Sequence, residues 1–193
     1  LSENLCSLLE NENRFVFCMD IHLNDENNDI NNISFTNALV KINKNFRYDD
    51  NDYKNNKDYN KIKDICNVLC KKYKYIKEVK DSHDLVAFLM VMMNAESAKK
   101  MIKFKDGIYR TLKLKDNLEL EKNNDIPNDI YNFIKIWQSS SGIYTNYLDK
   151  ETHELMSPTI GDYLHITSPI RRLVDLLNMM KLQSNLNLNL LSN

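Results

Sequence analysis

The sequence contains few glycines and few prolines, three of each among 193 residues, and no marked excess of charge of either sign. So few glycines argue against a glycine-rich phosphate loop, and so few prolines argue against a design rich in linkers. The formal net charge of −1 excludes a uniformly basic protein that coats nucleic acid. The longest apolar run, Leu85 to Met93, is about half of a bilayer span, so we expect no membrane partner.

Cysteine and histidine are also scarce, with four of each. There is no CxxC pair and no spacing typical of zinc ligands, so the sequence predicts structural thiols and no metal site. The first residues lack the basic start and long apolar stretch of a signal peptide. We therefore expect a reducing intracellular compartment, which the sequence does not narrow beyond cytoplasm, nucleus or organelle matrix. Because there is no initiator methionine, we also expect the chain to be part of a longer protein.

Asparagine and lysine dominate what is present, with 28 Asn and 21 Lys against only five Arg. Coding in an AT-rich genome explains both excesses, so the rarer residue types carry more information. The length allows one domain or at most two, and the hydrophobic content of 42% is enough for a buried core.

The first half of the chain predicts strands followed by helices. Large apolar side chains alternate over residues 14–22, which is typical of a strand, and residues 33–42 provide a partner after a polar turn. Ser82 is a plausible N-cap for an apolar helix that would be buried on all sides from Leu85 to Met93, where Asn94 would need hydrogen-bond partners. We predict an α+β fold with antiparallel strands packed on helices around 60–74, 83–101, 128–138 and 169–183.

The C-terminal segment from Gly161 contains the most informative motif. Ser168 followed by Pro169 predicts a helix start, with a capping oxygen and then proline in the first helical position. The stripe expected to face the core consists of Ile170, Leu173, Val174, Leu177 and Met180. The asparagine- and leucine-rich residues 184–193 predict a low-complexity tail.

Two adjacent arginines, Arg171 and Arg172, would lie in the first turn of this helix, where the macrodipole disfavours cations by a few tenths to about 1 kcal/mol. With Thr167 and Ser168 they would form a phosphate-binding corner, and Asp175 could orient either guanidinium. The alternative is a solvated arginine face with an aspartate partner.

The segment YLHITSPIRRLVDLL, residues 163–177, closely resembles the signature of the RNB family, the ribonuclease II/R and Dis3-like exoribonucleases. Weaker resemblances follow the same order along residues 1–183, among them LSENLCSLL, FTNALVKINKNFRY and LVAFLMVMMNAESA. The family hydrolyses single-stranded RNA from its 3′ end, using Mg²⁺ held by clustered aspartates. The resemblance therefore implies an RNB-like fold and a single-stranded RNA partner.

The resemblance also implies roles for individual residues. Arg171 would contact the reacting phosphate if the domain is active, and Arg172 would support it. Tyr48 would lie against the ribose at the 3′ end. The remaining members of the implied RNA-binding set are Tyr163, His165, Thr167 and Ser168, of which His165 would brace the loop.

The departures from the family pattern are as informative as the agreements. The family's aspartate cluster lies upstream of the segment that corresponds to residue 1, so this chain would be a partial RNB-like domain over 1–183 without Mg²⁺ ligands. A Glu-Glu pair of the family is replaced by Ala87 and Phe88, and a His-Arg pair by Met179 and Met180. These substitutions suggest that the fold and part of the phosphate site are kept while catalysis is lost.

Three functions stay open. The first is an RNA-binding domain, derived from an exoribonuclease, with weak or no nuclease activity as this chain, serving as a subunit of a ribonucleoprotein assembly. The second is an active Mg²⁺-dependent 3′→5′ exoribonuclease whose aspartates lie in an upstream segment or a separate chain. The third is a purely structural domain with no RNA in its channel.

Overall fold

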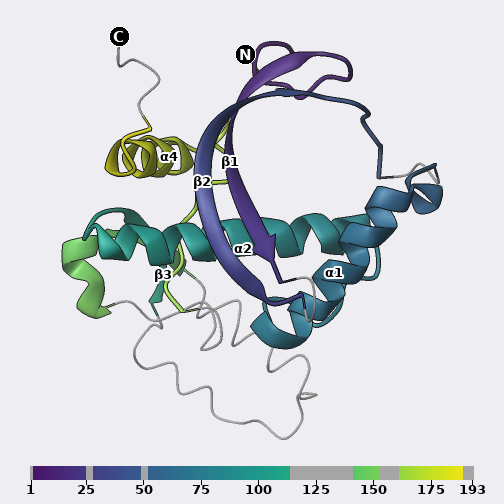
Figure 1. The fold of residues 1–193 in the computed structure, drawn as a ribbon. Coiled ribbons are helices and arrows are strands. Elements are labelled where there is room, and N and C mark those ends of the chain that lie inside the picture. Colours follow the sequence, from purple (N-terminus) through teal and green to yellow (C-terminus); the bar gives the residue numbers. More distant parts are fainter. Residues whose placement is uncertain (1, 25–27, 49–51, 114–140, 153–160, 189–193) are drawn as a thin grey trace, which may run out of the picture.

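A computed structural model describes residues 2–24, 28–48, 52–113, 141–152 and 161–188. It has the predicted α+β fold, with antiparallel strands and three helices in the described residues (Figure 1). The helix expected at 128–138 and the loop expected at 116–128 lie outside the described residues. The elements in chain order are β1 (Asn13–Leu23), β2 (Ile30–Lys41), η1 (Asp52–Asn55), α1 (Lys57–Tyr73), α2 (Ser82–Lys103), β3 (Ile108–Lys113), β4 (Ser141–Asn146), η2 (Tyr147–Thr152) and α4 (Leu173–Asn185).

The predicted hairpin is confirmed: β1 pairs antiparallel with β2, from Asn13 opposite Lys41 to Ile21 opposite Ile33. The pair forms a long curved ribbon that crosses α2 (Figure 1). Phe17 and Phe35 stack on its inner face with ring centroids 5.8 Å apart. Because alternate residues point to the same side of a strand, this face carries the apolar side chains into the core.

The two helices that follow the hairpin both begin at side-chain caps. Asn56 caps α1 by accepting a hydrogen bond from the Tyr59 amide at 2.9 Å. For α2 the cap is Asp81, whose carboxylate accepts from the Asp84 amide at 3.0 Å, and Ser82 is the first helical residue. The predicted N-cap was therefore wrong by one residue, because Asp81 supplies a charged acceptor at the positive end of the helix.

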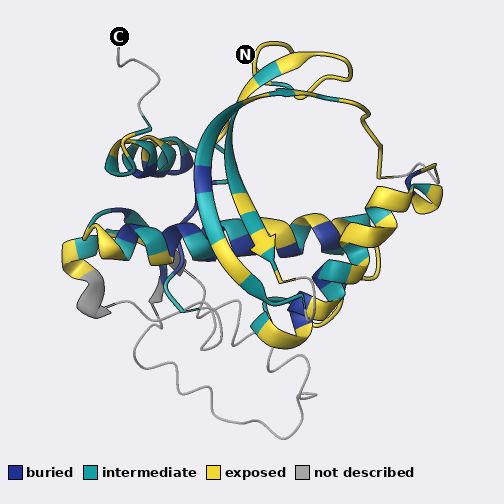
Figure 2. Cartoon of the chain, viewed as in Figure 1, coloured by how far each residue is buried: buried dark blue, intermediate teal, exposed yellow. Residues whose placement is uncertain are grey.

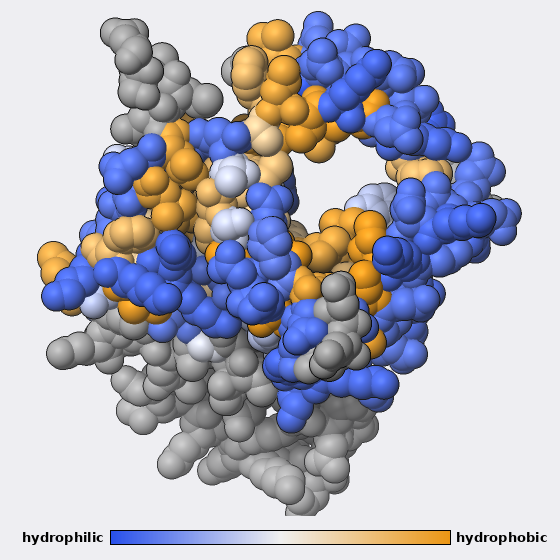
Figure 3. Space-filling view, viewed as in Figure 1, coloured by the Kyte–Doolittle hydropathy of each residue, from blue (hydrophilic) through white to orange (hydrophobic). Residues whose placement is uncertain are grey.

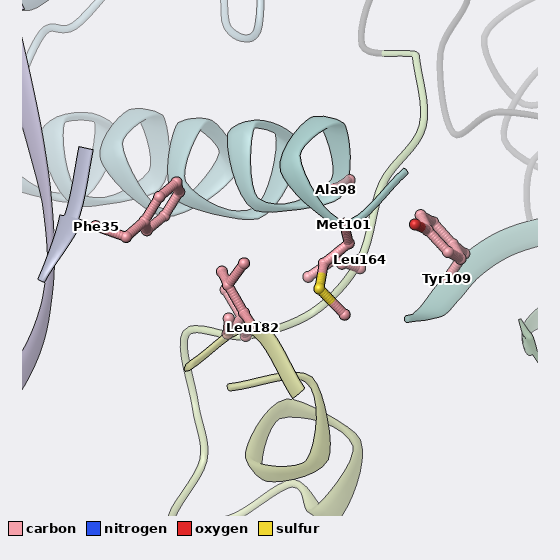
Figure 4. Close-up of a cluster of buried hydrophobic side chains, with 7 residues drawn as sticks. Phe35, Ala98, Met101, Tyr109, Leu164 and Leu182 are labelled. Carbon is pink, nitrogen blue, oxygen red and sulfur yellow. The ribbon is translucent and has the colours of Figure 1, made fainter. Parts of the chain in front are cut away.

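The central helix α2 separates two apolar clusters of buried residues. One joins α2 to the hairpin, α4 and the strand segments through Phe35, Ala98, Met101, Tyr109, Leu164, Ile166 and Leu182 (Figure 4). The other joins α2 to α1 through Cys66, Leu69, Cys70, Val79, Leu85, Phe88 and Met92. Buried positions recur along α2 where the hairpin crosses it (Figure 2).

The prediction that α2 is buried on all sides was wrong. Val86, Leu89 and Met90 are exposed, so the apolar run from Leu85 to Met93 has one face toward solvent. A space-filling view shows an opening through the molecule between the hairpin, the segment that leads from β2 to α1, and α1 itself (Figure 3).

The helix α4 begins later than predicted and presents a different face to the core. It starts at Leu173, after a turn, and its buried residues are Asp175, Asn178 and Leu182. The stripe expected to be buried is instead largely exposed, as shown by Ile170, Leu173, Leu177 and Met180. Polar partners for Asp175 and Asn178 inside the molecule set this orientation. Beyond α4, Leu186 and Leu188 pack against the cluster of Figure 4.

Candidate nucleic-acid interface

The motif segment from Tyr163 to Arg172 leads into α4 and is held at its start by backbone contacts with β3. The Arg110 amide donates to the Tyr163 carbonyl at 2.8 Å, and Tyr109 forms an isolated bridge with Leu164. Because the amides and carbonyls of β3 fix this segment, its side chains have defined positions relative to the β3–β4 pair.

Asn94 of α2 fixes the same segment from the other side. It is 1% exposed, its amide group donates to the Tyr163 hydroxyl at 2.8 Å, and its Oδ1 accepts from the Ile166 amide at 3.0 Å. Burial raises the pKa of the Tyr163 hydroxyl, so this group stays a neutral partner for Asn94. The expectation that Asn94 needs hydrogen-bond partners in the core is confirmed.

Asn178 of α4 is completely buried and ties the helix to two segments at once. Its Oδ1 accepts from the Ile108 amide at 2.9 Å, and its Nδ2 donates to the Ile108 carbonyl at 2.9 Å and to the His165 carbonyl at 3.0 Å. The side-chain amide thus satisfies both polar groups of one backbone residue, and it sets where α4 lies beside the motif.

The two arginines lie just before the helix and not in its first turn as predicted. A turn forms in which the Arg171 and Arg172 amides both donate to the Ser168 carbonyl, at 3.2 and 3.1 Å. The Ser168 amide donates to the carboxylate of Asp175 at 2.8 Å. Asp175 therefore holds the turn from the helix side, which explains why the helix does not start at Ser168–Pro169.

Asp175 also binds Arg172, through two contacts of 2.8 Å to the two carboxylate oxygens. The carboxylate is completely buried, so the pair removes an otherwise uncompensated charge from the core. Arg172 is thus fixed in direction before any ligand binds, whereas the exposed side chain of Arg171 has no hydrogen bond or ion pair to the residues that the structure describes.

His165 lies at the centre of the site, only 8% exposed. Its Nδ1 is 2.7 Å from the hydroxyl of Tyr144 on β4 and 3.4 Å from Nη1 of Arg172. Burial lowers the pKa of this imidazole to about 4, and the nearby Arg172 and Arg110 add to that effect, so His165 is neutral at physiological pH. Asp175 opposes the shift.

Three of the five arginines in the chain gather around this neutral histidine. Arg172 contacts the ring directly, Arg171 precedes Arg172 in the same turn, and Arg110 lies opposite Tyr144, whose hydroxyl binds the ring. The positive charge of each disfavours the charged form of His165. One of these arginines, Arg172, is paired with the carboxylate of Asp175. Nε of Arg110 and Oγ1 of Thr167 are buried without a hydrogen-bond partner in the described part of the chain. This arrangement suits a bound anion.

Tyr48 lies apart from this cluster. Its ring stacks on His83, in the first turn of α2, with centroids 4.0 Å apart, and it is 49% exposed. From His83 to Asn94 the helix rises about 16 Å at about 1.5 Å per residue. The structure thus brings Tyr163, His165, Thr167, Ser168, Arg171 and Arg172 together and leaves Tyr48 near the start of α2.

The described residues do not fit a magnesium site. No group of three or more His, Cys, Asp or Glu side chains that could hold a metal occurs in the ranges that the structure covers. The carboxylate nearest the arginines, Asp175, already binds Arg172 and the Ser168 amide. Hard cations such as Mg²⁺ need oxygen ligands that are free to coordinate. We therefore derive no step through a metal from these residues.

Two residues of the site, Arg110 and Tyr144, were not singled out as functional from the sequence. For Arg110 the available signal is its rarity, as one of five arginines. Tyr144 had no local signal, because its contact with His165 joins residues 21 positions apart.

No helix in the described ranges is both long and apolar enough to cross a membrane.

Comparison with known proteins identifies the fold. No family model and no curated protein matches the sequence. Among solved structures, the chain is similar to RNase R from Mycoplasma genitalium in complex with ribose-methylated single-stranded RNA, with a TM-score of 0.71 and 21% identity, over 96% of this chain and 39% of that one. It is also similar to an active-site mutant of the Dss1 exoribonuclease from Candida glabrata, with a TM-score of 0.62 and 18% identity, over 95% and 31% of the two chains.

Both neighbours are RNB-family 3′→5′ exoribonucleases, so the fold is the one that the sequence motif predicted. The chain spans less than two-fifths of the length of each.

Proposed function

We propose that this chain is an RNB-like domain that binds single-stranded RNA, with a backbone phosphate on Arg171 and Arg172. We further propose that it derives from a 3′→5′ exoribonuclease, has weak or no nuclease activity as this chain, and works as a subunit of a ribonucleoprotein assembly. The observation that carries the proposal is the placement of Arg171, Arg172 and Arg110 beside His165, with Arg172 3.4 Å from its ring and Arg110 opposite Tyr144, in a chain whose net charge is −1. Support also comes from the RNase R structure of the same fold, which contains single-stranded RNA.

The chemistry of the site favours phosphate over other anions. Arg172 is fixed by Asp175, while Arg171 is exposed with its guanidinium free to form two parallel hydrogen bonds. Backbone phosphates repeat along an RNA strand, so one fixed and one free guanidinium can hold one phosphate or two successive ones. The proposed loss of activity rests on the absence of a carboxylate cluster from the described residues and on Ala87 and Phe88 in α2.

The variant that tests the RNA site is Arg171→Ala. Its side chain is exposed, so the fold should be kept, whereas Arg172→Ala would leave the buried Asp175 unpaired and destabilise the domain. We expect Arg171→Ala to weaken single-stranded RNA binding about tenfold or more, since a hydrogen bond to a charged group contributes about 1.5–3 kcal/mol. The slope of log affinity against log salt should become shallower by about 0.7, as one phosphate contact is lost.

The matched control is Lys57→Ala, which removes one exposed positive charge at the start of α1. Fluorescence anisotropy with a labelled single-stranded RNA over a salt series measures both quantities. Equal affinities for Arg171→Ala, the control and the unmodified chain would overturn the proposal and favour the purely structural alternative.

The second candidate, an active exoribonuclease completed by an upstream segment, is favoured by the small share of each exoribonuclease chain that this chain spans. Incubating the chain together with that upstream segment and 5′-labelled single-stranded RNA, with and without Mg²⁺, separates the two candidates on native and denaturing gels. Bound but intact RNA supports the first. A Mg²⁺-dependent ladder of shortened RNA would show that catalysis survives.

A further inference from the structure

Tyr144 combines two features that a purely structural tyrosine does not need together. Its hydroxyl is tied into the centre of the arginine cluster, 2.7 Å from Nδ1 of His165, yet the residue is 42% exposed. It lies on β4 directly opposite Arg110 of β3, so both side chains project from the same face of the two-stranded pair.

The direction of the hydrogen bond follows from the neighbours of His165. Nη1 of Arg172 also approaches Nδ1, at 3.4 Å, and a guanidinium can only donate. Nδ1 is therefore the acceptor, the ring proton is on Nε2, and the Tyr144 hydroxyl donates. His165 is itself fixed, because Asn178 binds its carbonyl and the Tyr163 ring lies edge-on to the imidazole at 5.6 Å. Tyr144 is thus held at its hydroxyl end while the ring meets solvent.

We propose that the exposed ring of Tyr144 is a stacking platform for a nucleobase of the RNA strand whose phosphate binds Arg171 and Arg172. This inference rests on the proposed RNA site and adds a base contact to its phosphate contacts. Every nucleobase has a flat aromatic surface, so such a platform accepts any sequence while requiring a single strand with an unstacked base. A ring held by His165 loses little freedom when a base stacks on it, which favours binding.

The proposal is tested with Tyr144→Leu, which keeps apolar bulk but removes the aromatic surface, and Tyr144→Phe, which keeps the ring but removes the hydroxyl. Since stacking on an aromatic side chain contributes about 1–3 kcal/mol, Tyr144→Leu should bind single-stranded RNA roughly 5- to 150-fold more weakly. Tyr144→Phe should stay within about threefold of the unmodified chain, since the stacking surface remains. Ile143→Ala, a neighbouring half-exposed side chain on the opposite face of β4, is the control and should change affinity little.

A series of RNAs, each with one abasic nucleotide, separates base stacking from a general loss of structure. At one position the abasic RNA should bind the unmodified chain more weakly, and Tyr144→Leu should then cause no further loss. Equal losses for Tyr144→Leu on every RNA in the series, abasic or not, would overturn the platform and assign the residue a structural role.

The two variants distinguish an error in the stacking platform from an error in the proposed RNA site. If Arg171→Ala weakens binding and Tyr144→Leu does not, the phosphate site stands and the platform is wrong. If neither variant changes affinity, the proposed function is wrong as well. Thermal unfolding of each variant shows whether it folds, and Tyr144→Phe gives a second measurement should Tyr144→Leu unfold.

Discussion

At the scale of single residues, the candidate site depends on a histidine that must stay uncharged. Three arginines surround His165, and a fourth positive charge on the imidazole would repel all of them. The neutral ring accepts the Tyr144 hydroxyl and so joins β4 to the motif segment. Buried Asp175, Asn94 and Asn178 complete a polar network: Asp175 and Asn94 bind the motif segment, and Asn178 binds both that segment and β3.

The stability of the domain should therefore depend on pH through His165. The ordinary histidine pKa is about 6.5 and the folded value is about 4, so below pH 6.5 the unfolded chain binds a proton that the folded chain does not. The stability that the domain gains from keeping His165 neutral is complete above about pH 6.5. It is lost as the pH falls toward 4, which lowers the free energy of unfolding by about 3 kcal/mol in total. Urea denaturation over this range measures it.

His165→Asn keeps a hydrogen-bond acceptor but does not titrate, so the slope between pH 6.5 and 4 should flatten. His22→Gln, at an exposed position of β1, should keep the slope of the unmodified chain. Carboxylates such as Asp106, whose pKa is lowered by contacts with Lys181, Gly107 and Asn185 despite partial burial, lose their contribution at lower pH than this window. An unchanged slope in His165→Asn would contradict the assignment.

At the scale of elements, α4 shows how a helix can bury its polar side. Asp175, Asn178 and Leu182 face inward, at positions three and four residues apart, while Leu173, Leu177 and Met180 face outward. Buried hydrogen bonds to Ser168, Ile108 and His165 replace the apolar contacts that such a helix usually makes. The packing of α4 against the rest of the domain therefore depends on these hydrogen bonds and on the completely buried side chain of Leu182.

Leucine-to-alanine substitutions on the two faces should therefore differ strongly. Leu182→Ala removes a side chain with no exposed surface and should cost about 2–5 kcal/mol of unfolding free energy. Leu177→Ala, on the exposed face at 38% exposure, should cost less than about 1 kcal/mol. Urea titrations of the two variants give the comparison directly. Similar costs would mean that α4 packs through the apolar face after all.

Prediction from the sequence succeeded for elements whose apolar residues face the core. It failed where buried polar residues determine which face of an element is buried. Alternation through Phe15, Phe17, Met19 and Ile21 located β1, since all of these but the exposed Phe15 pack on the core. The same rule assigned the wrong face of α4, because the partners of Asp175 and Asn178 come from distant segments. The motif located Arg171 and Arg172, but local sequence contains no information about the long-range contact of Tyr144 with His165 or the pairing of Arg110 with Tyr144.

At the scale of the whole molecule, the hairpin joins two cores into one structure. Met19 and Ile33, which lie diagonally across the two strands of the hairpin, pack against both apolar clusters, and α2 contributes buried residues to each. The helices α1 and α4 lie on different sides of the curved ribbon (Figure 1). Each packs in one cluster, and both clusters share the hairpin and α2. The proposed phosphate site depends on both clusters, because Asn94 in the middle of α2 positions the motif.

We therefore expect the two clusters to unfold together. Leu69→Ala, in the cluster between α1 and α2, should lower the free energy of unfolding by about 2–5 kcal/mol. Native-state hydrogen exchange should show a similar loss of protection for the slowest amides of α4, which lies in the other cluster. Loss of protection confined to α1 and α2 would mean that the clusters open independently.

The paired contact of Asn178 with Ile108 has a consequence beyond the position of α4. A strand whose amide and carbonyl face outward is a template on which another chain can add a strand, a common start of aggregation. In β3 the amide and carbonyl of Ile108 are both hydrogen-bonded to the side-chain amide of Asn178, which takes the place of a peptide group of another strand. The next outward amide, that of Arg110, donates to the Tyr163 carbonyl. The helix thus closes the strand against other copies of the chain. If α4 detaches, self-association that increases with protein concentration should precede any loss of secondary structure.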